Sequence, residues 1–174
     1  MTRRFPALVL VWSLAGCAPR PPAPASPPAS TEQPAVASAD SVVLTLERTP
    51  CFGTCPVYRV AVTGDGIVRF EGKSHVSHPG SAAGQVPKAR LDSLLAEHDA
   101  GGYFGFEEAY VMGSPASGNA ATDLPTVTTS VRLDGRTKRI EHYRGCSAAP
   151  QALSQLEERI DEVLDTGRWT GRRS

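Results

Sequence analysis

Two pairs of alternating segments, each joined by a glycine-containing turn, constrain what this chain can fold into more than any other feature. The segments are residues 57–62 and 67–71 around Gly64-Asp65-Gly66, and residues 124–133 and 137–143 around Asp134-Gly135. A period of two is typical of half-buried strands, and these turn sequences supply the positive φ angles that tight hairpins need. The sequence therefore predicts two antiparallel β-hairpins.

Each hairpin is followed by a segment with the apolar spacing of an amphipathic helix. After Pro87, residues 88–98 carry Leu91, Leu94 and Leu95 at helical positions. Residues 152–164 carry a longer apolar stripe, which begins after Pro150 and is expected to end at Gly167. Spacings of three and four residues place such side chains on one helix face, so two helices are predicted.

The remaining segments of the domain complete the fold prediction. Residues 41–48 have the β-branched composition of a strand, and residues 72–87 are expected to be loop-like or edge-like. The aromatic segment 103–106 is expected in the core, and residues 112–119 are expected to form a flexible loop. The predicted class is α+β: an antiparallel sheet of about five strands with two helices on one face.

The N-terminus has the features of an exported chain. Arg3 and Arg4 precede an apolar run over residues 5–14, which is too short to span a bilayer. The following Leu14-Ala15-Gly16-Cys17 resembles the lipobox of bacterial lipoproteins. That resemblance implies cleavage before Cys17 and lipid attachment to its sulfur, with palmitate-like acyl chains holding the protein in a bilayer. Because Ala18 is not the aspartate of inner-membrane retention, the implied location is the outer membrane, facing the periplasm, in a cell that has one.

Composition divides the chain into four parts. Residues 1–16 are the predicted signal peptide, residues 17–40 a lipidated cysteine with a Pro/Ala-rich tether, residues 41–167 one domain, and residues 168–174 a basic tail. Extended proline-rich chain rises ~3.1 Å per residue, so the tether reaches up to ~70 Å from the membrane. The chain has 18 basic and 18 acidic residues, and this balance predicts no nucleic-acid partner.

A specific motif links the domain to a known family. Pro50-Cys51-Phe52-Gly53-Thr54-Cys55-Pro56-Val57-Tyr58, together with Tyr103-Phe104, Tyr110 and Thr122-Asp123-Leu124-Pro125-Thr126, resembles domain-of-unknown-function family 6438. The family comprises uncharacterised domains of exported bacterial proteins. The resemblance covers residues 42–164 and implies no activity. Cys146 is a departure, because it stands where the pattern has a Gly-Ala-Pro-like lead-in to the last helix.

Three cysteines of the domain leave alternative pairings open. Cys51 and Cys55 are predicted to form a disulfide in an oxidising compartment, since Gly53 lets the short segment bend. Cys146 is the alternative partner of either residue.

A metal or thiol-redox site is the alternative use of these residues. Cys51 and Cys55, with His142 and Cys146, form two pairs of soft ligands, and His75 and His78 form a weaker pair. Pro56 and a strand follow Cys55, whereas reactive thiols favour a helix N-terminus. No metal or cofactor is therefore assigned.

No catalytic motif of hydrolases or phosphotransferases is present in the sequence. The acidic pairs 107–108, 157–158 and 161–162 are interpreted as solvated faces. Tyr110 and Asp123, beside the flexible loop, are the candidate binding surface, with a turn-capping role for Asp123 as the alternative. The sequence favours a non-catalytic envelope lipoprotein that binds an envelope protein or wall component, and the alternative is a thiol-redox or metal enzyme.

Overall fold

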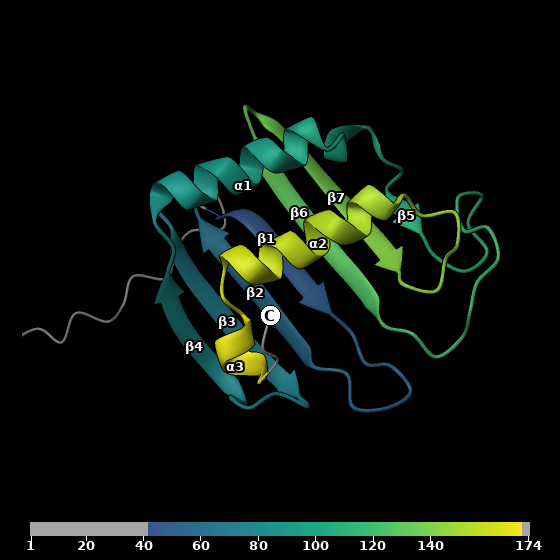
Figure 1. Ribbon diagram of the computed structural model, residues 1–174, viewed down its shortest axis with the longest axis horizontal. Coiled ribbons are helices and arrows are strands. Elements are labelled where there is room, and N and C mark those ends of the chain that lie inside the picture. The colour runs from purple at the N-terminus through teal and green to yellow at the C-terminus, as the bar shows by residue number, and fades with distance from the viewer. Residues whose placement is uncertain (1–41, 172–174) are drawn as a thin grey trace, which may run out of the picture. The chain divides into compact units, whose positions relative to one another are not determined.

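A single mixed sheet of seven strands dominates the computed structural model, which describes residues 42–171 (Figure 1). The strands lie in the order β4-β3-β2-β1-β6-β7-β5. Their bounds are β1 Val42–Arg48, β2 Val57–Thr63, β3 Ile67–Ser74, β4 Gly80–Gln85, β5 Ala109–Tyr110, β6 Thr126–Leu133 and β7 Arg136–Tyr143. The expected α+β class is correct. The expected signal peptide, lipidated Cys17 and tether lie outside the described residues.

Both predicted hairpins are present and pair in regular antiparallel register. β2 pairs with β3, and β6 pairs with β7 from Thr126 opposite Tyr143 to Leu133 opposite Arg136. In the second turn Asp134 and Gly135 have φ angles of 52° and 75°. Two consecutive positive φ angles match the twist of the flanking strands, which explains why Asp-Gly stands at this position.

The prediction of about five antiparallel strands is roughly right, but it omits two edge strands. Residues 72–87, expected to be loop-like or edge-like, complete β3 and contain the edge strand β4, which pairs antiparallel with β3. The two-residue β5 lies at the opposite edge and runs parallel to β7. β4 lacks β-branched and aromatic residues, and β5 forms through a long-range pairing, so neither strand has a clear local signal.

The two predicted helices cover the same face of the sheet, as Figure 1 shows. They are α1, Lys88–Ala100, and α2, Gln151–Val163. Inward side chains of both helices, including Leu91, Leu94 and Ile160, are fully buried against the strands. Among residues 42–171 there is no helix with the length and apolar character needed to cross a membrane.

The chain after α2 departs from the predicted end of the domain. Gly167 does not end the long helix; it begins a short helix, α3 (Gly167–Thr170). Trp169, assigned from the sequence to a basic tail, is buried and stacks on Phe70 with ring centroids 4.9 Å apart. Arg168 lies over the Trp169 ring, 3.9 Å from its centroid. These two residues therefore belong to the packed domain.

The aromatic segment 103–106 contributes to the core as expected, but unequally. Tyr103, in the 3₁₀ turn η2 (Tyr103–Gly105), is fully buried, and its hydroxyl hydrogen-bonds Thr129 Oγ1 at 2.8 Å. Phe104 and Phe106 are only partly buried against the core. Tyr103 also meets the buried His98 edge-on, at 5.4 Å between ring centroids.

Candidate functional site

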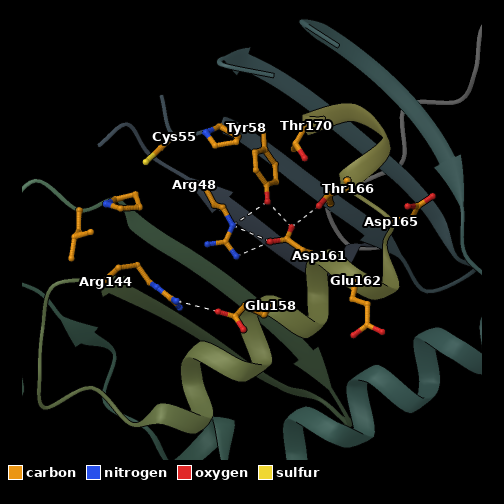
Figure 2. A pocket seen from close by; sticks show the side chains of 14 residues that line it. Arg48, Cys55, Tyr58, Arg144, Glu158, Asp161, Glu162, Asp165, Thr166 and Thr170 are labelled. Atoms are coloured by element: carbon orange, nitrogen blue, oxygen red, sulfur yellow. Dashed lines mark hydrogen bonds and ion pairs between the residues drawn. The ribbon is translucent and has the colours of Figure 1, made fainter. Parts of the chain in front are cut away.

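A partly buried carboxylate, that of Asp161, joins α2 to the first two strands at one end of the sheet. Arg48 at the end of β1 donates from Nε and Nη2 to Asp161 Oδ2, at 3.0 and 2.6 Å. Tyr58 of β2 and Thr166 donate hydroxyl hydrogen bonds to Asp161 Oδ1, at 2.5 and 2.8 Å. We call Arg48, Tyr58, Asp161 and Thr166 the Asp161 cluster; Figure 2 shows its side chains converging on the one carboxylate.

The environment keeps the basic and phenolic groups of the Asp161 cluster protonated. Burial lowers the pKa of the Arg48 guanidinium, but the Asp161 carboxylate and Tyr58 outweigh this effect, so the pKa is raised. Burial, and then the neighbouring Asp161 charge, raise the pKa of the Tyr58 phenol. Because four donors already converge on Asp161, its carboxylate is committed to bonds within the protein. The cluster therefore connects α2 to β1 and β2 and stabilises the packing of the helix on the sheet.

A second carboxylate, this one fully buried, lies one helical turn earlier on α2. Glu157 is only 1% exposed, and its two oxygens accept from His142 Nδ1 at 2.7 Å and Arg144 Nη1 at 2.8 Å. Arg144 also reaches the exposed Glu158 at 3.2 Å. Two donors therefore satisfy the buried charge, as its removal from water requires.

These clusters border a cleft between the start of β2, the loop before β6 and the C-terminal half of α2 (Figure 2). The cavity has a volume of about 460 Å³. One side is mainly apolar and consists of Cys55, Pro56, Leu124 and Pro125. The other side carries the carboxylates of Glu158, Glu162 and Asp165. Arg48 and Arg144 also line the cleft, which is therefore apolar on its loop side and charged, with more acidic than basic groups, on its helix side.

A disulfide closes the loop that forms the apolar side. Cys51 and Cys55 are bonded, with their Cα atoms 5.8 Å apart, which is the pairing favoured by the sequence. The Phe52 N–H donates to the Asp123 carbonyl at 3.1 Å, and two further hydrogen bonds join Thr49 to Thr126. The disulfide loop, residues 51–55, is thus attached both to itself and to the loop before β6.

The attached loop holds a large apolar side chain in solvent. Phe52 is 88% exposed, and Leu124, on the neighbouring loop, is 42% exposed. Full burial of a phenylalanine side chain is worth roughly 1.5–3 kcal/mol, and this domain forgoes that gain at Phe52. A rigidly held, exposed aromatic is typical of the anchor residues of binding surfaces.

The two residues selected from the sequence as a binding surface occupy different environments. Tyr110 is only 4% exposed, and its hydroxyl accepts a hydrogen bond from the Glu107 N–H, so it is a buried residue of β5 and not a surface residue. Asp123 is exposed, with a φ of 71°, and receives a hydrogen bond from Thr122. Its backbone supports the disulfide loop through Phe52.

The residues of the metal alternative are engaged separately. The sulfurs of Cys51 and Cys55 are bonded to each other, and His142 is bonded to Glu157. Cys146 is a free, buried thiol, and burial raises its pKa, which disfavours the thiolate. Within residues 42–171 no three His, Cys, Asp or Glu side chains are arranged to hold a metal ion.

The remaining histidine pair lies in the segment between β3 and β4. His75 has a φ of 53° in the segment between β3 and β4, whereas the His78 ring approaches the Ser81 carbonyl at 3.4 Å.

Sequence reasoning missed the two clusters on α2. The pairs 157–158 and 161–162, interpreted as solvated faces, each contain one residue that is bonded inside the protein, Glu157 and Asp161. The available signal was their position: both carboxylates fall on the side of α2 that carries Leu153, Leu156 and Ile160. Their partners on β1, β2 and β7 are distant in sequence.

The profile of the family described as Domain of unknown function (DUF6438) matches residues 42–164. The match includes the disulfide loop, both hairpins and the two long helices, and it ends in the turn between α2 and α3. No curated protein matches the chain at a level that indicates relationship.

Proposed function

The chain belongs to the DUF6438 family, and from that premise we propose that it is a lipid-anchored envelope protein whose α+β domain binds a partner at the disulfide loop and the adjoining cleft. The observation that carries the binding role is the exposure of Phe52 on a loop held by a disulfide and by hydrogen bonds. The anchoring role is supported by the lipobox-like residues ending at Cys17.

The direction of the first strand suits such an arrangement. Val42 begins β1 and Arg48 ends it, and the disulfide loop follows shortly afterwards. Seven strand residues at ~3.3 Å each separate the entry of the chain from this loop by roughly 23 Å. A domain tethered through its N-terminus can therefore present Phe52 away from its point of attachment, towards a protein or wall component and not towards its own bilayer.

The lining of the cleft indicates the chemistry of the partner. An apolar group fits against Pro56, Leu124 and Pro125. The opposite side carries more carboxylates than cations: Glu158, Asp161, Glu162 and Asp165 against Arg48 and Arg144. Part of this negative charge is balanced, because Arg48 pairs with Asp161, Arg144 with Glu158 and Arg159 with Glu162. Complementary charge improves both encounter rate and selectivity. The proposed ligand is a peptide-like segment that carries an apolar side chain beside a lysine, an arginine or a free amine.

The anchoring half of the proposal is tested on protein isolated from its own cells. Mass spectrometry is expected to find a mature chain that begins at Cys17 and carries acyl chains, with radiolabelled palmitate incorporated. Cys17→Ser is expected to abolish the label and release the domain from the membrane fraction. An intact first methionine without fatty acid contradicts this half and leaves the binding half to its own test.

The binding half is tested by affinity purification of the anchored protein after gentle cross-linking. A defined protein or wall fragment is expected to co-purify with the native chain and to be lost from Phe52→Ser. Ile67→Ser is the matched control, because Ile67 is also an exposed apolar residue, at 38%, and lies in the first hairpin. Equal recovery with both variants contradicts the assignment of Phe52.

The alternative proposal, a thiol-redox or metal enzyme, draws on one observation: Cys55 lies in the lining of the cleft. It requires Cys51 and Cys55 to cycle between dithiol and disulfide, or to bind a metal with His142 and Cys146. Thiol titration and metal analysis of envelope-isolated protein decide the matter. One free thiol per domain under both oxidising and mildly reducing growth conditions, with no bound metal, would exclude this alternative.

A further inference from the structure

The second surface of interest is the free edge of the sheet at β4. Within residues 42–171 this strand, Gly80–Gln85, is the outermost in the strand order and pairs only with β3. Its sequence is Gly-Ser-Ala-Ala-Gly-Gln, without charge, proline or bulk. Edge strands usually carry charged residues, proline or bulky side chains, because an open row of unpaired backbone groups is a template for pairing with another chain. At the opposite edge, β5 is only two residues long.

The register identifies the backbone groups that β4 presents to solvent. The Val86 N–H donates to the Gly66 carbonyl at 2.9 Å, and the ladder continues without a shift from Ile67 opposite Gln85 to Gly72 opposite Gly80. In an antiparallel pair, bonded and non-bonded positions alternate, so Gly84, Ala82 and Gly80 face β3. Ser81, Ala83 and Gln85 therefore direct their N–H and C=O groups outward.

The position of His78 agrees with this derivation. Its ring Nε2 lies 3.4 Å from the Ser81 carbonyl oxygen, a contact that requires the carbonyl to point away from β3. Both partners are exposed, so an incoming strand can displace the histidine with little loss.

The surroundings of this edge favour an acidic partner. On the face of the sheet opposite the two long helices, a hollow beside Ser81 and Ala83 contains Arg59, Arg69 and a single carboxylate, Glu71. On the helix face, the Arg168 guanidinium lies so close to Gly84 that a Cβ on this residue would clash with Nη2. Glycine at position 84 is what allows this approach, so both faces of the edge carry arginine.

We propose that β4 binds an extended, proline-free acidic peptide segment of a partner protein by strand addition. The outward groups of Ser81, Ala83 and Gln85 supply the backbone bonds, and alternate acidic side chains of the peptide meet the arginines beside the edge. A second copy of this chain is a poorer occupant, because its own β4 offers no carboxylate. This surface is separate from the cleft and does not depend on it.

The probe is a capped peptide of about eight residues with alternating Glu and Val, a length that matches an ordinary strand. It is added to the full chain in detergent, with fluorescence anisotropy and amide hydrogen exchange as readouts. The expected result is saturable binding with slowed exchange at residues 81, 83 and 85. A Lys-Val peptide of the same length and a Glu-Val peptide N-methylated at alternate residues are expected not to bind.

The variant that tests the backbone is Ala83→Pro, which removes one outward N–H while leaving every bond to β3 in place. Peptide affinity is expected to fall by about tenfold, the factor expected for loss of a backbone hydrogen bond and of the strand fit around it. Ala83→Ser is the matched control and is expected to bind as the native chain does. Thermal melting of both variants verifies that the domain is folded.

Three results would overturn the proposal. They are absence of Glu-Val binding up to about 1 mM peptide, equal binding of the Lys-Val peptide, and protection of residues 81–85 that rises with protein concentration in the absence of peptide. The third result would assign the edge to a second copy.

Discussion

The two sides of the cleft use their side chains in opposite ways. On the helix side, the Asp161 carboxylate accepts hydrogen bonds from Arg48, Tyr58 and Thr166, so this charged group is bonded within the protein. On the loop side, Phe52 is 88% exposed and has no share in the core. The polar groups of the Asp161 cluster are thus partly withdrawn from water, whereas the aromatic ring of Phe52 is exposed to it.

This contrast separates residues that stabilise the fold from residues that the fold exposes for binding. Removing a member of the Asp161 cluster leaves partly buried partners without a counter-charge, which is costly. Removing the Phe52 side chain takes away nothing that other residues depend on. We therefore expect stability to depend on the helix side and binding to depend on the loop side.

The largest effect is expected for Asp161→Ala. The substitution leaves Arg48, Tyr58 and Thr166 without their common acceptor, and the free energy of unfolding is expected to fall by about 2–4 kcal/mol. Urea denaturation measures it. Glu162→Ala, one residue along and mostly exposed, is the matched control and is expected to stay within about 0.5 kcal/mol. Equal effects of the two substitutions would show that the Asp161 cluster does not stabilise the domain more than an exposed residue of α2 does.

The next effect is expected from the double variant Cys51→Ser, Cys55→Ser. A ring this small constrains the unfolded chain only modestly, so the loss is expected to be about 1–2 kcal/mol. Amide exchange at Phe52 should accelerate more than exchange in β1, because the loop loses its closure. Reduced native protein is the control and should match the variant; unchanged exchange at Phe52 would show that the disulfide does not hold this loop.

A third test compares the cleft with the core beneath α1. His98 is fully buried and its Nδ1 bonds the Leu94 carbonyl, while burial lowers its pKa below the usual 6.5. The unfolded chain then binds a proton that the folded chain refuses, so stability is full above pH 6.5 and falls as pH decreases below it.

One proton limits the slope of this decline to about 1.4 kcal/mol per pH unit. Urea unfolding at a series of pH values from about 7.5 down to about 5 measures the slope. His98→Leu should reduce it, whereas the exposed His75→Ala should not. An unaltered slope in His98→Leu would assign the acid sensitivity elsewhere.

The smallest effect on stability is expected for Phe52→Ser. The free energy of unfolding should change by no more than about 0.5 kcal/mol, because the side chain contacts solvent. Denaturation beside the native chain measures this change. A loss above roughly 1.5 kcal/mol, the value of burying such a side chain, would show that Phe52 packs in the domain. It would contradict the expectation that the loop side does not contribute to stability.

Local signals predicted the local parts of this structure. Asp134-Gly135 specified a turn through its positive φ angles, and the apolar spacing through Leu153 and Ile160 specified α2. The β4 strand was missed because Gly80–Gln85 has little strand propensity and depends on pairing with β3. Long-range pairing likewise determines β5.

The candidate site was less visible in the sequence than the fold. The bond between Arg48 and Asp161 spans 113 positions, and no local pattern reports it. Tyr110 was assigned to the surface because the sequence does not distinguish a tyrosine hydroxyl exposed to water from one that accepts a hydrogen bond inside the protein. Here the hydroxyl accepts from the Glu107 N–H. The cysteine motif was informative because two cysteines four positions apart restrict the loop between them.

Site-specific photo-cross-linking in intact cells shows whether the domain meets its partner at Phe52, as we propose. With a benzoylphenylalanine cross-linker at position 52, we expect one discrete adduct, which disappears when Leu124→Asp is added. The same cross-linker at position 67, on another exposed apolar residue, should give none. Adducts that are equal at both positions, or absent at position 52, would contradict the claim.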